Sequence, residues 1–159
     1  QLIHRFKYDG AWRLARDMGV WYGHCLAESG LYDGVETIVP VPLHWRKRLR
    51  RGYNQSEYLA EGIARALGAN VERHSVRRIR NNPAQALHHR EERWDNVEGI
   101  FCVRHPERLA GRHILLVDDV LTTGATLLSC AEAILRAAPD CRISVAVLAV
   151  SQREFGLDG

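Results

Sequence analysis

ILLVDDVLTTGAT, residues Ile114–Thr126, carries the strongest structural signal in the sequence. Its first four residues are apolar, which is typical of a strand buried on both faces of a parallel sheet. Two acids, Asp118 and Asp119, follow, and a threonine-rich turn then leads into an apolar helical pattern. Open parallel sheets bind ligands at the carboxyl ends of their strands. The stretch therefore predicts a ligand site where this strand ends.

The turn after the acids predicts an anion site. Free N–H groups and the positive end of the helix dipole favour a phosphate there, and the threonine hydroxyls add donors. The residues expected to surround it are Thr122, Thr123, Gly124, Ala125 and Thr126. Ionised carboxylates only accept hydrogen bonds, so the two acids should meet sugar hydroxyls or Mg²⁺ and not the phosphate. A strand and capped helix that bind no ligand are the alternative.

Three other classes of phosphate chemistry do not fit this stretch. A response-regulator receiver would need a lysine and a longer chain after the acids, whereas the last lysine is Lys47. A phosphatase with an aspartate nucleophile needs Asp-x-Asp, and here the two acids are adjacent. A P-loop would need GxxxxGK followed by serine or threonine, which does not occur in the sequence.

Hydrophobic periodicity on either side predicts alternating strands and helices. The expected helices are about 11–29, 54–67 and 124–137, and the expected strands are 37–42, 71–79, 99–103, 113–118 and 143–150. A basic loop is expected at 43–53, and Asn54 with Glu57 predicts a capping box at the start of the second helix. This order predicts an α/β fold, a twisted and mainly parallel sheet with helices on both faces.

Length and composition are typical of one soluble domain. The 159 residues divide into an N-terminal helical region, 1–35, and a core, 36–150, with a polar loop at 80–97. No apolar run is long enough to cross a membrane, so no membrane insertion is expected. The four cysteines form no CxxC pair, which predicts no zinc site in this chain and a cytoplasmic location. All but two of the 22 basic residues are arginines, which suits phosphate ligands but equally fits a GC-rich genome.

The thirteen-residue stretch closely resembles the phosphoribosyl-pyrophosphate motif of type I phosphoribosyltransferases. The resemblance implies the fold of that superfamily and Mg²⁺ as cofactor. It also implies that Asp118 and Asp119 face the ribose, where they would stabilise positive charge on the reacting sugar as the catalytic carboxylates. They would meet Mg²⁺ directly or through the ribose. The loop Thr122–Thr126 would hold the 5-phosphate.

Two further segments resemble the ComF-type phosphoribosyltransferase family, without its N-terminal zinc-binding segment. They are VPVPLHWRKRLRRGYNQ, residues 39–55, and NPAQALHHREERWDNVEGIF, residues 82–101. By this resemblance the first segment binds pyrophosphate through Arg48, Arg51, Gly52 and Asn54. The second belongs to a flexible flap, 80–97, that closes over the site with Gln85, Arg90 and Arg93. A solvated basic loop is the alternative for the first segment, and so is a nucleic-acid contact flanked by Trp45 and Tyr53.

The sequence thus favours a protein that binds phosphoribosyl pyrophosphate with Mg²⁺ and transfers the phosphoribosyl group to an acceptor that the sequence does not identify. The alternative that the ComF resemblance implies is an accessory protein of DNA uptake. Such a protein would bind single-stranded DNA or competence partners and use phosphoribosyl pyrophosphate only as a ligand. A sensor of phosphoribosyl pyrophosphate is a third interpretation, and a homodimer is a further expectation.

Overall fold

The computed structural model describes residues 12–80 and 99–151. Its helices are α2 (Trp12–Glu28), α3 (Trp45–Arg51), α4 (Gln55–Leu67), the short 3-10 helix η1 (Pro106–Arg108) and α6 (Ala125–Ala137). Its strands are β1 (Thr37–Pro40), β2 (Asn70–Val71), β3 (Val76–Arg78), β4 (Phe101–Val103), β5 (His113–Leu121) and β6 (Arg142–Val150). No helix in the described ranges is long and apolar enough to cross a membrane.

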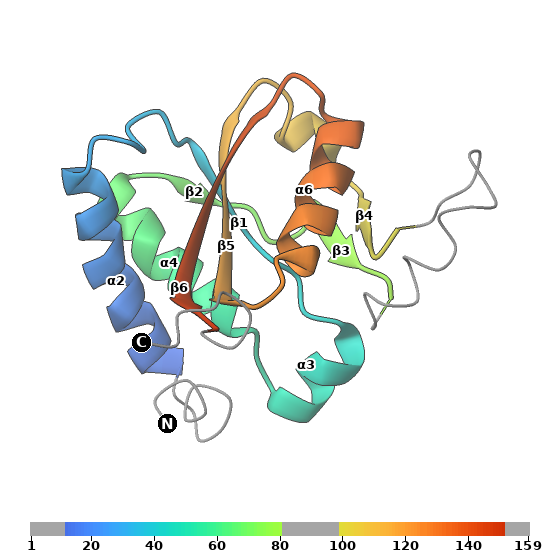
Figure 1. Cartoon of the computed structure of the whole chain (residues 1–159), viewed down its shortest axis with the longest axis horizontal. Helices are drawn as coiled ribbons and strands as arrows, with labels where there is room; N and C mark the ends of the chain where they lie inside the picture. The colour runs from blue at the N-terminus through green and yellow to red at the C-terminus, as the bar shows by residue number, and fades with distance from the viewer. Residues whose placement is uncertain (1–11, 81–98, 152–159) are drawn as a thin grey trace.

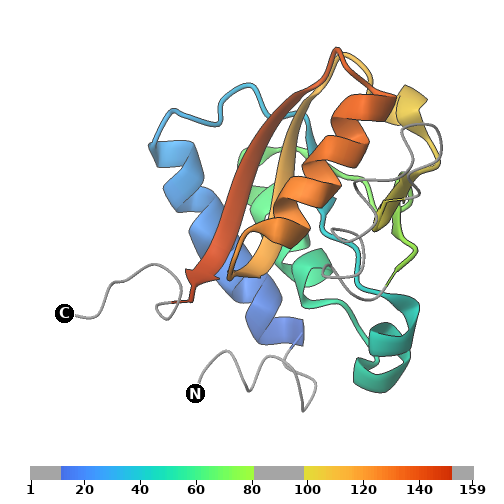
Figure 2. The same cartoon turned by 45° about the vertical axis from the view of Figure 1, so that its right-hand side comes forward.

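The central sheet has four parallel strands in the order β2-β1-β5-β6. Helices α2 and α4 lie on one face and α6 lies on the other, as Figure 1 and the turned view in Figure 2 show. Strands β3 and β4 form a separate antiparallel pair beside α6. The predicted fold class is confirmed, since a parallel sheet carries helices on both faces.

Side chains alternate between the two faces of β5 and fill two cores. Ile114 and Leu116 pack in the core on the α6 side. Leu115 and Val117 pack in the core on the α4 side, and all four side chains are fully buried. The apolar run that predicted a strand buried on both faces is therefore placed as expected.

Glycines let α2 approach α4 closely. A Cβ added to Gly62 of α4 would overlap the backbone of Arg16 and Gly19 in α2. The two helices therefore pack backbone against backbone. Helix α4 in turn contacts both β1 and β5, so this stack covers the middle of the sheet at the strands that lead into the predicted site.

The strand predicted at 71–79 is wrong as a single element, because it is two strands in two sheets. Strand β2 pairs with β1, whereas β3 pairs with β4. The carboxylate of Glu72 accepts hydrogen bonds from the backbone N–H groups of His74 and Ser75, at 2.8 and 3.0 Å. This side-chain turn ends β2 and turns the chain away from the central sheet.

The basic loop predicted at 43–53 is also wrong in part, because it contains the seven-residue helix α3. The imidazole of His44 accepts a hydrogen bond from the Arg46 N–H and caps the start of the helix. Gly52 ends it with φ at +80°, a conformation that glycine adopts without steric cost. The run of basic residues was interpreted as a loop, but the caps at His44 and Gly52 mark the two ends of a helix.

Candidate functional site

The two acids lie inside β5, not after it. Strand β5 was expected to end at Asp118, but its pairing with β6 continues through Leu121, which is in register with Val150. The apolar run ends at the acids, but the pairing with β6 continues beyond Asp118, because Val120 and Leu121 are also in register with residues of β6. The carboxylates are therefore held on a hydrogen-bonded strand at the carboxyl edge of the sheet.

Asp118 is mostly buried and shares one oxygen between two donors. Its Oδ1 accepts from the Ser56 hydroxyl at 3.0 Å and from the Asp119 N–H at 2.9 Å. Burial, and next the neighbouring charge of Asp119, raise the pKa of Asp118 to about 7, while the two hydrogen bonds oppose that rise. At neutral pH this carboxyl group is therefore poised between its acidic and ionised forms.

Sequence reasoning missed Ser56, which lies 62 residues from Asp118 along the chain. The serine is the second residue of α4, and Asn54 caps that helix by accepting from the Ser56 N–H at 3.3 Å. The cap therefore fixes the position from which the Ser56 hydroxyl reaches Asp118. The N-cap pattern at Asn54 predicted where α4 begins, but it carries no information about the contact between Ser56 and Asp118.

A buried arginine also interacts with Asp118, and no sequence pattern pointed to it. Arg78, the last residue of β3, is 8% exposed, and its guanidinium lies over the Phe101 ring at 5.5 Å. Burial lowers the pKa of Arg78, and the charge of Asp118 opposes that change. Burial raises the pKa of the Cys130 thiol, which interacts with the same two charges. Electrostatic interactions among Arg78, Asp118 and Cys130 thus connect β3, β5 and α6.

The threonine-rich turn that is predicted to bind an anion leads from β5 into α6. Helix α6 begins at Ala125 after Gly124, whose φ is +78°, and no side chain makes a capping hydrogen bond at that position. Thr123 is exposed, and its Oγ1 accepts from the Ala125 N–H at 3.3 Å. Glycine at the N-cap therefore leaves the first turn of the helix accessible to a ligand.

The residues predicted to bind pyrophosphate lie in different environments in the structure. Asn54 is buried and uses its amide inside the protein, since Nδ2 donates to the Val41 carbonyl at 3.1 Å while Oδ1 caps α4. Gly52 ends α3, and its N–H donates to the Arg48 carbonyl. The guanidinium of Arg48 is exposed and pairs with Glu57 at 3.3 Å. Glu57 thus pairs with an arginine and does not complete the expected capping box with Asn54.

The side chain of Arg51 is outside the described part of the structure, as are the flap residues Gln85, Arg90 and Arg93. Their roles, like those of Arg48, Gly52 and Asn54 toward pyrophosphate, stay predictions. Within the described residues, the structure brings together Asp118, Asp119 and the loop Thr122–Thr126 on one strand–turn–helix unit. It adds Ser56 and Arg78 to them from two other elements.

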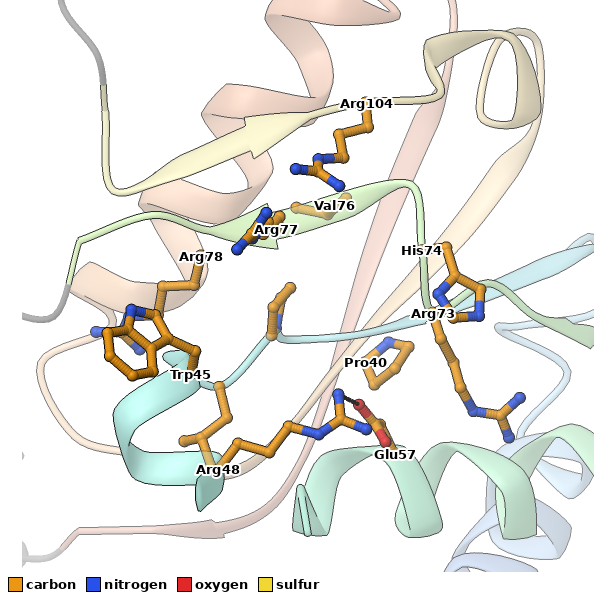
Figure 3. A pocket seen from close by; sticks show the side chains of 12 residues that line it. Pro40, Trp45, Arg48, Glu57, Arg73, His74, Val76, Arg77, Arg78 and Arg104 are labelled. Carbon is orange, nitrogen blue, oxygen red and sulfur yellow. Dashed lines mark hydrogen bonds and ion pairs between the residues drawn. The ribbon is translucent and has the colours of Figure 1, made fainter. Parts of the chain in front are cut away.

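A cavity of about 220 Å³ lies beside β1, and Figure 3 shows the arginines around it. Strand β2 pairs only with Thr37 and Ile38, so it leaves the flank of Pro40 uncovered. On its other flank Pro40 is in register with Val117, the residue before Asp118. The cavity therefore lies beside the end of β1, and Arg78 connects it to the acid pair, because this arginine lines the cavity and interacts with Asp118. Sequence reasoning did not foresee the cavity.

Comparison with known proteins gives a match to a family model. The model is described as a phosphoribosyl transferase domain and matches residues 54–156. The chain is 34% identical to DNA utilization protein YhgH of Escherichia coli strain K12 over 139 residues, which make up 85% of this chain and 60% of that protein. It is also 34% identical to competence protein F of Haemophilus influenzae over 130 residues, 79% of this chain and 57% of that protein. The chain thus spans less than two thirds of the length of these relatives.

Solved structures share the arrangement of the elements. A hypoxanthine phosphoribosyltransferase from Staphylococcus aureus matches with a TM-score of 0.51 and 10% sequence identity, over 97% of this chain and 73% of that structure. At such low identity the likeness concerns the fold alone. It agrees with the parallel sheet and helices described above.

Proposed function

Because this chain belongs to the phosphoribosyl transferase domain family, we propose that it binds phosphoribosyl pyrophosphate with Mg²⁺ and transfers the phosphoribosyl group to an acceptor. The resemblance seen in the sequence is confirmed at the level of the family, and competence protein F is among the relatives. The ligand, the metal and the transfer are the proposal.

One observation carries this proposal. A partly buried acid pair on β5 is followed, after a short turn, by the glycine-capped start of α6, so hydrogen-bond acceptors and free helix N–H groups lie on one strand–turn–helix unit at the carboxyl edge of the sheet. A phosphorylated sugar presents the matching groups, hydroxyls beside a phosphate. A lone phosphate would gain nothing from the carboxylates, and a plain sugar would gain nothing from the helix start.

Each part of the unit has a chemical task in this proposal. The loop Thr122–Thr126 binds the 5-phosphate through N–H groups and hydroxyls. Asp118 and Asp119 accept hydrogen bonds from the ribose hydroxyls and, as negative charges, favour the positive charge that develops on the ring as pyrophosphate leaves. Ser56 holds the Asp118 carboxylate in place through its 3.0 Å hydrogen bond.

The donor set also suits Mg²⁺. Two adjacent carboxylates next to a phosphate loop provide the oxygen ligands that Mg²⁺ prefers, together with ligand oxygens and water. In this proposal Asp118 and Asp119 would hold the ion, directly or through the sugar hydroxyls. The bound ion would offset the charge of the pyrophosphate.

Calorimetric titration with phosphoribosyl pyrophosphate and Mg²⁺ tests the ligand. We expect one site per chain, and we expect the double variant Asp118→Asn with Asp119→Asn to bind at least tenfold more weakly, because two charge-assisted acceptors are lost. Asp140→Asn is the matched control, since that exposed acid precedes β6 and lies outside the unit. Equal affinity in the double variant and the control would contradict the assignment of the acids.

Release of pyrophosphate tests the transfer. Purines, pyrimidines and amines are supplied as acceptors together with phosphoribosyl pyrophosphate and Mg²⁺, and an acceptor-dependent release is expected for one class. The double variant of the acid pair should lose this release. Tight binding without release across the panel would favour a protein that only binds the ligand.

The names of the relatives support a second candidate function. One relative is named for the utilization of DNA, DNA utilization protein YhgH, and another for competence, competence protein F. On that ground the alternative is an accessory protein that binds single-stranded DNA or a protein partner. An affinity for single strands that falls steeply with salt, survives Asp118→Asn and is lost on Arg48→Ala with Arg51→Ala would favour this alternative.

A further inference from the structure

Strand β6 lies at one edge of the central sheet, and within residues 12–80 and 99–151 no strand pairs with its outer side. On its inner side its nine residues pair with β5. The outer N–H and C=O groups of an edge strand can pair with a further strand, and many proteins prevent this with lysine or proline. The sequence of β6, RISVAVLAV, contains neither. The outer side of β6 is therefore open to pairing.

On one face of the sheet, exposed apolar side chains continue from β6 onto α6. Val145 is in register with Leu116, which packs on the α6 side, and it is 43% exposed. Leu128 and Leu135 lie seven residues apart, so they share one side of α6, and both are exposed. Helix α6 contacts β4 on its other side, and Figure 2 shows the helix between β6 and the β3–β4 pair. The two leucines therefore lie toward β6.

On the other face of the sheet, the apolar surface continues onto α2. Leu14 and Trp21 are also seven residues apart and share one side of that helix, and Trp21 is 65% exposed. Gly19 packs against α4 on another side of α2. Tyr22, the neighbour of Trp21, interacts with the backbone of Val147, so this part of α2 lies against the middle of β6.

The three elements form one apolar surface, which we call the β6 face. Monomeric proteins rarely expose contiguous apolar patches larger than a few hundred Å². At about 3.3 Å per residue β6 is about 30 Å long, and three layers of about 10 Å each lie across it, so the whole face covers on the order of 900 Å². A stable interface buries about 800 Å² on each partner. The exposed apolar side chains of the face are Leu14, Trp21, Leu128, Leu135, Val145 and Val150.

The partner that fits this edge is a strand that is apolar on both faces, because apolar side chains border the edge on both sides. Strand β6 is itself such a strand, since all of its residues except Arg142 and Ser144 are apolar. Most homodimers have a two-fold axis, which makes two strands that meet edge to edge antiparallel. The two copies of Arg142 then lie at opposite ends of the pair and do not repel each other.

We propose that the β6 face is the interface between two copies of this chain, related by a two-fold axis that pairs their β6 strands antiparallel. The two central sheets then form one continuous sheet. Helix α2 packs against α2 of the second copy and α6 packs against its α6, which buries Trp21, Leu128 and Leu135. The second strand replaces Tyr22 at the backbone of Val147. This inference gives the expected homodimer a specific interface, and it goes beyond the proposed function because it does not depend on any ligand.

Sedimentation equilibrium of the whole chain tests the assembly. We expect a dimer at micromolar concentrations. Val145→Lys and, separately, Trp21→Lys should raise the dissociation constant of the dimer at least tenfold, because each places a charge on the apolar face. Leu49→Lys is the matched control, since this residue of α3 is 76% exposed and lies outside the face, and it should change the constant less than twofold. Circular dichroism checks that each variant is folded, and Trp21→Lys carries the test if Val145→Lys is not.

Hydrogen exchange locates the interface. Amides of Arg142–Val150 should lose protection when the protein is diluted below the dissociation constant, whereas those of Asn70–Val71, at the opposite edge of the sheet, should not change.

Four results would overturn the proposal. They are a monomer at all concentrations, equal dimerisation of the two face variants and the control, dilution-dependent protection outside the β6 face alone, and protection of β6 that does not change with dilution. The last result would mean that another part of the same chain covers the edge. Failure to bind phosphoribosyl pyrophosphate would reject the proposed function alone, since neither experiment contains that ligand.

Discussion

The junction between β5 and α6 and the cavity beside β1 are both suited to phosphate, but they are built in different ways. The junction uses backbone geometry: a glycine-capped helix start, threonine hydroxyls and two acids held on a paired strand. The cavity uses long charged side chains that converge from separate segments. If the proposed function holds, the junction would distinguish a phosphorylated sugar from other anions, whereas the cavity would respond mainly to charge.

The two regions differ because their hydrogen-bond donors belong to different parts of the chain, the backbone at the junction and long side chains at the cavity. Backbone N–H groups and short hydroxyls are fixed by the strand–turn–helix unit, so they lose little freedom when a ligand binds. Arginine side chains carry up to about 2 kcal/mol of conformational entropy each, which binding has to offset. We therefore expect the junction to be sensitive to single local changes and the cavity to be sensitive to ionic conditions.

The largest change in affinity is expected when an acidic residue is introduced into the loop Thr122–Thr126. Thr123→Asp puts a negative charge at the site proposed for the 5-phosphate, so binding of phosphoribosyl pyrophosphate should weaken by about two orders of magnitude. Binding of inorganic pyrophosphate, which has no sugar phosphate to place in the loop, should weaken much less. Calorimetry on both ligands measures this contrast, with Thr123→Ser as the conservative control. Equal losses for both ligands would mean that the loop does not specifically meet the 5-phosphate.

The next effect concerns pH. The pKa of Asp118 is raised to about 7 by burial and by Asp119, so the carboxyl group is mostly protonated at pH 6 and mostly ionised at pH 8. Ribose hydroxyls and Mg²⁺ need the ionised form. The affinity for phosphoribosyl pyrophosphate with Mg²⁺ should therefore rise about tenfold from pH 6 to pH 8. Asp118→Asn should bind weakly with a flat profile over the same range. A wild-type profile as flat as that of Asp118→Asn would show that Asp118 does not meet the ligand.

Ionic strength should also affect ligand affinity differently at the two regions, but by a smaller factor. Exposed guanidinium groups are screened by salt, with a Debye length of about 10 Å at 0.1 M and about 3 Å at 1 M. Between 0.05 and 0.5 M potassium chloride we expect pyrophosphate binding to fall severalfold more than binding of phosphoribosyl pyrophosphate. Equal salt dependence would contradict the view that hydrogen bonds dominate at the junction and charge dominates in the cavity.

The smallest expected effect is a change in the melting temperature of the protein without ligand. Arg77→Gln with Arg104→Gln relieves repulsion among the arginines that line the cavity, and it should raise the melting temperature by about 1–3 °C, the size expected for exposed charges. A control pair, Arg65→Gln with Arg136→Gln, should not raise it, because both residues lie at helix C-termini, where positive charge is favourable. A lower melting temperature in the Arg77 and Arg104 variant would contradict the repulsion.

Much of the fold was predictable because its signals are local. The apolar run before Asp118 predicted the buried strand, Gly124 and the threonines predicted the turn, and Asn54 predicted the start of α4. The errors lie where a local pattern was ambiguous. A dense run of arginines concealed α3, and the β-branched residues at 71–79 gave no sign of the turn that Glu72 makes.

The candidate site was predictable only in the part that is continuous in sequence. Asp118, Asp119 and the loop occupy consecutive positions, so their chemistry could be inferred from spacing. Ser56 and Arg78 could not be found in this way. Serine and arginine are common at protein surfaces, and their presence does not indicate a contact with a residue 40 or more positions away in the sequence. The contacts of the Asn54 amide inside the protein were also visible only in the structure, and its role toward pyrophosphate stays a prediction.

By itself, the sequence determined the family, the parallel α/β architecture and the strand–turn–helix unit that holds the acids and the threonine-rich loop. The family was identified from the resemblance of its motifs, whereas the architecture and the unit follow from backbone propensity and hydrophobic period, which act over a few neighbouring residues. Only the tertiary structure decided the state of Asp118 and the existence of the arginine cavity. Burial and convergence of charges depend on which distant segments pack together, and electrostatic energies follow distances in space and not positions along the chain.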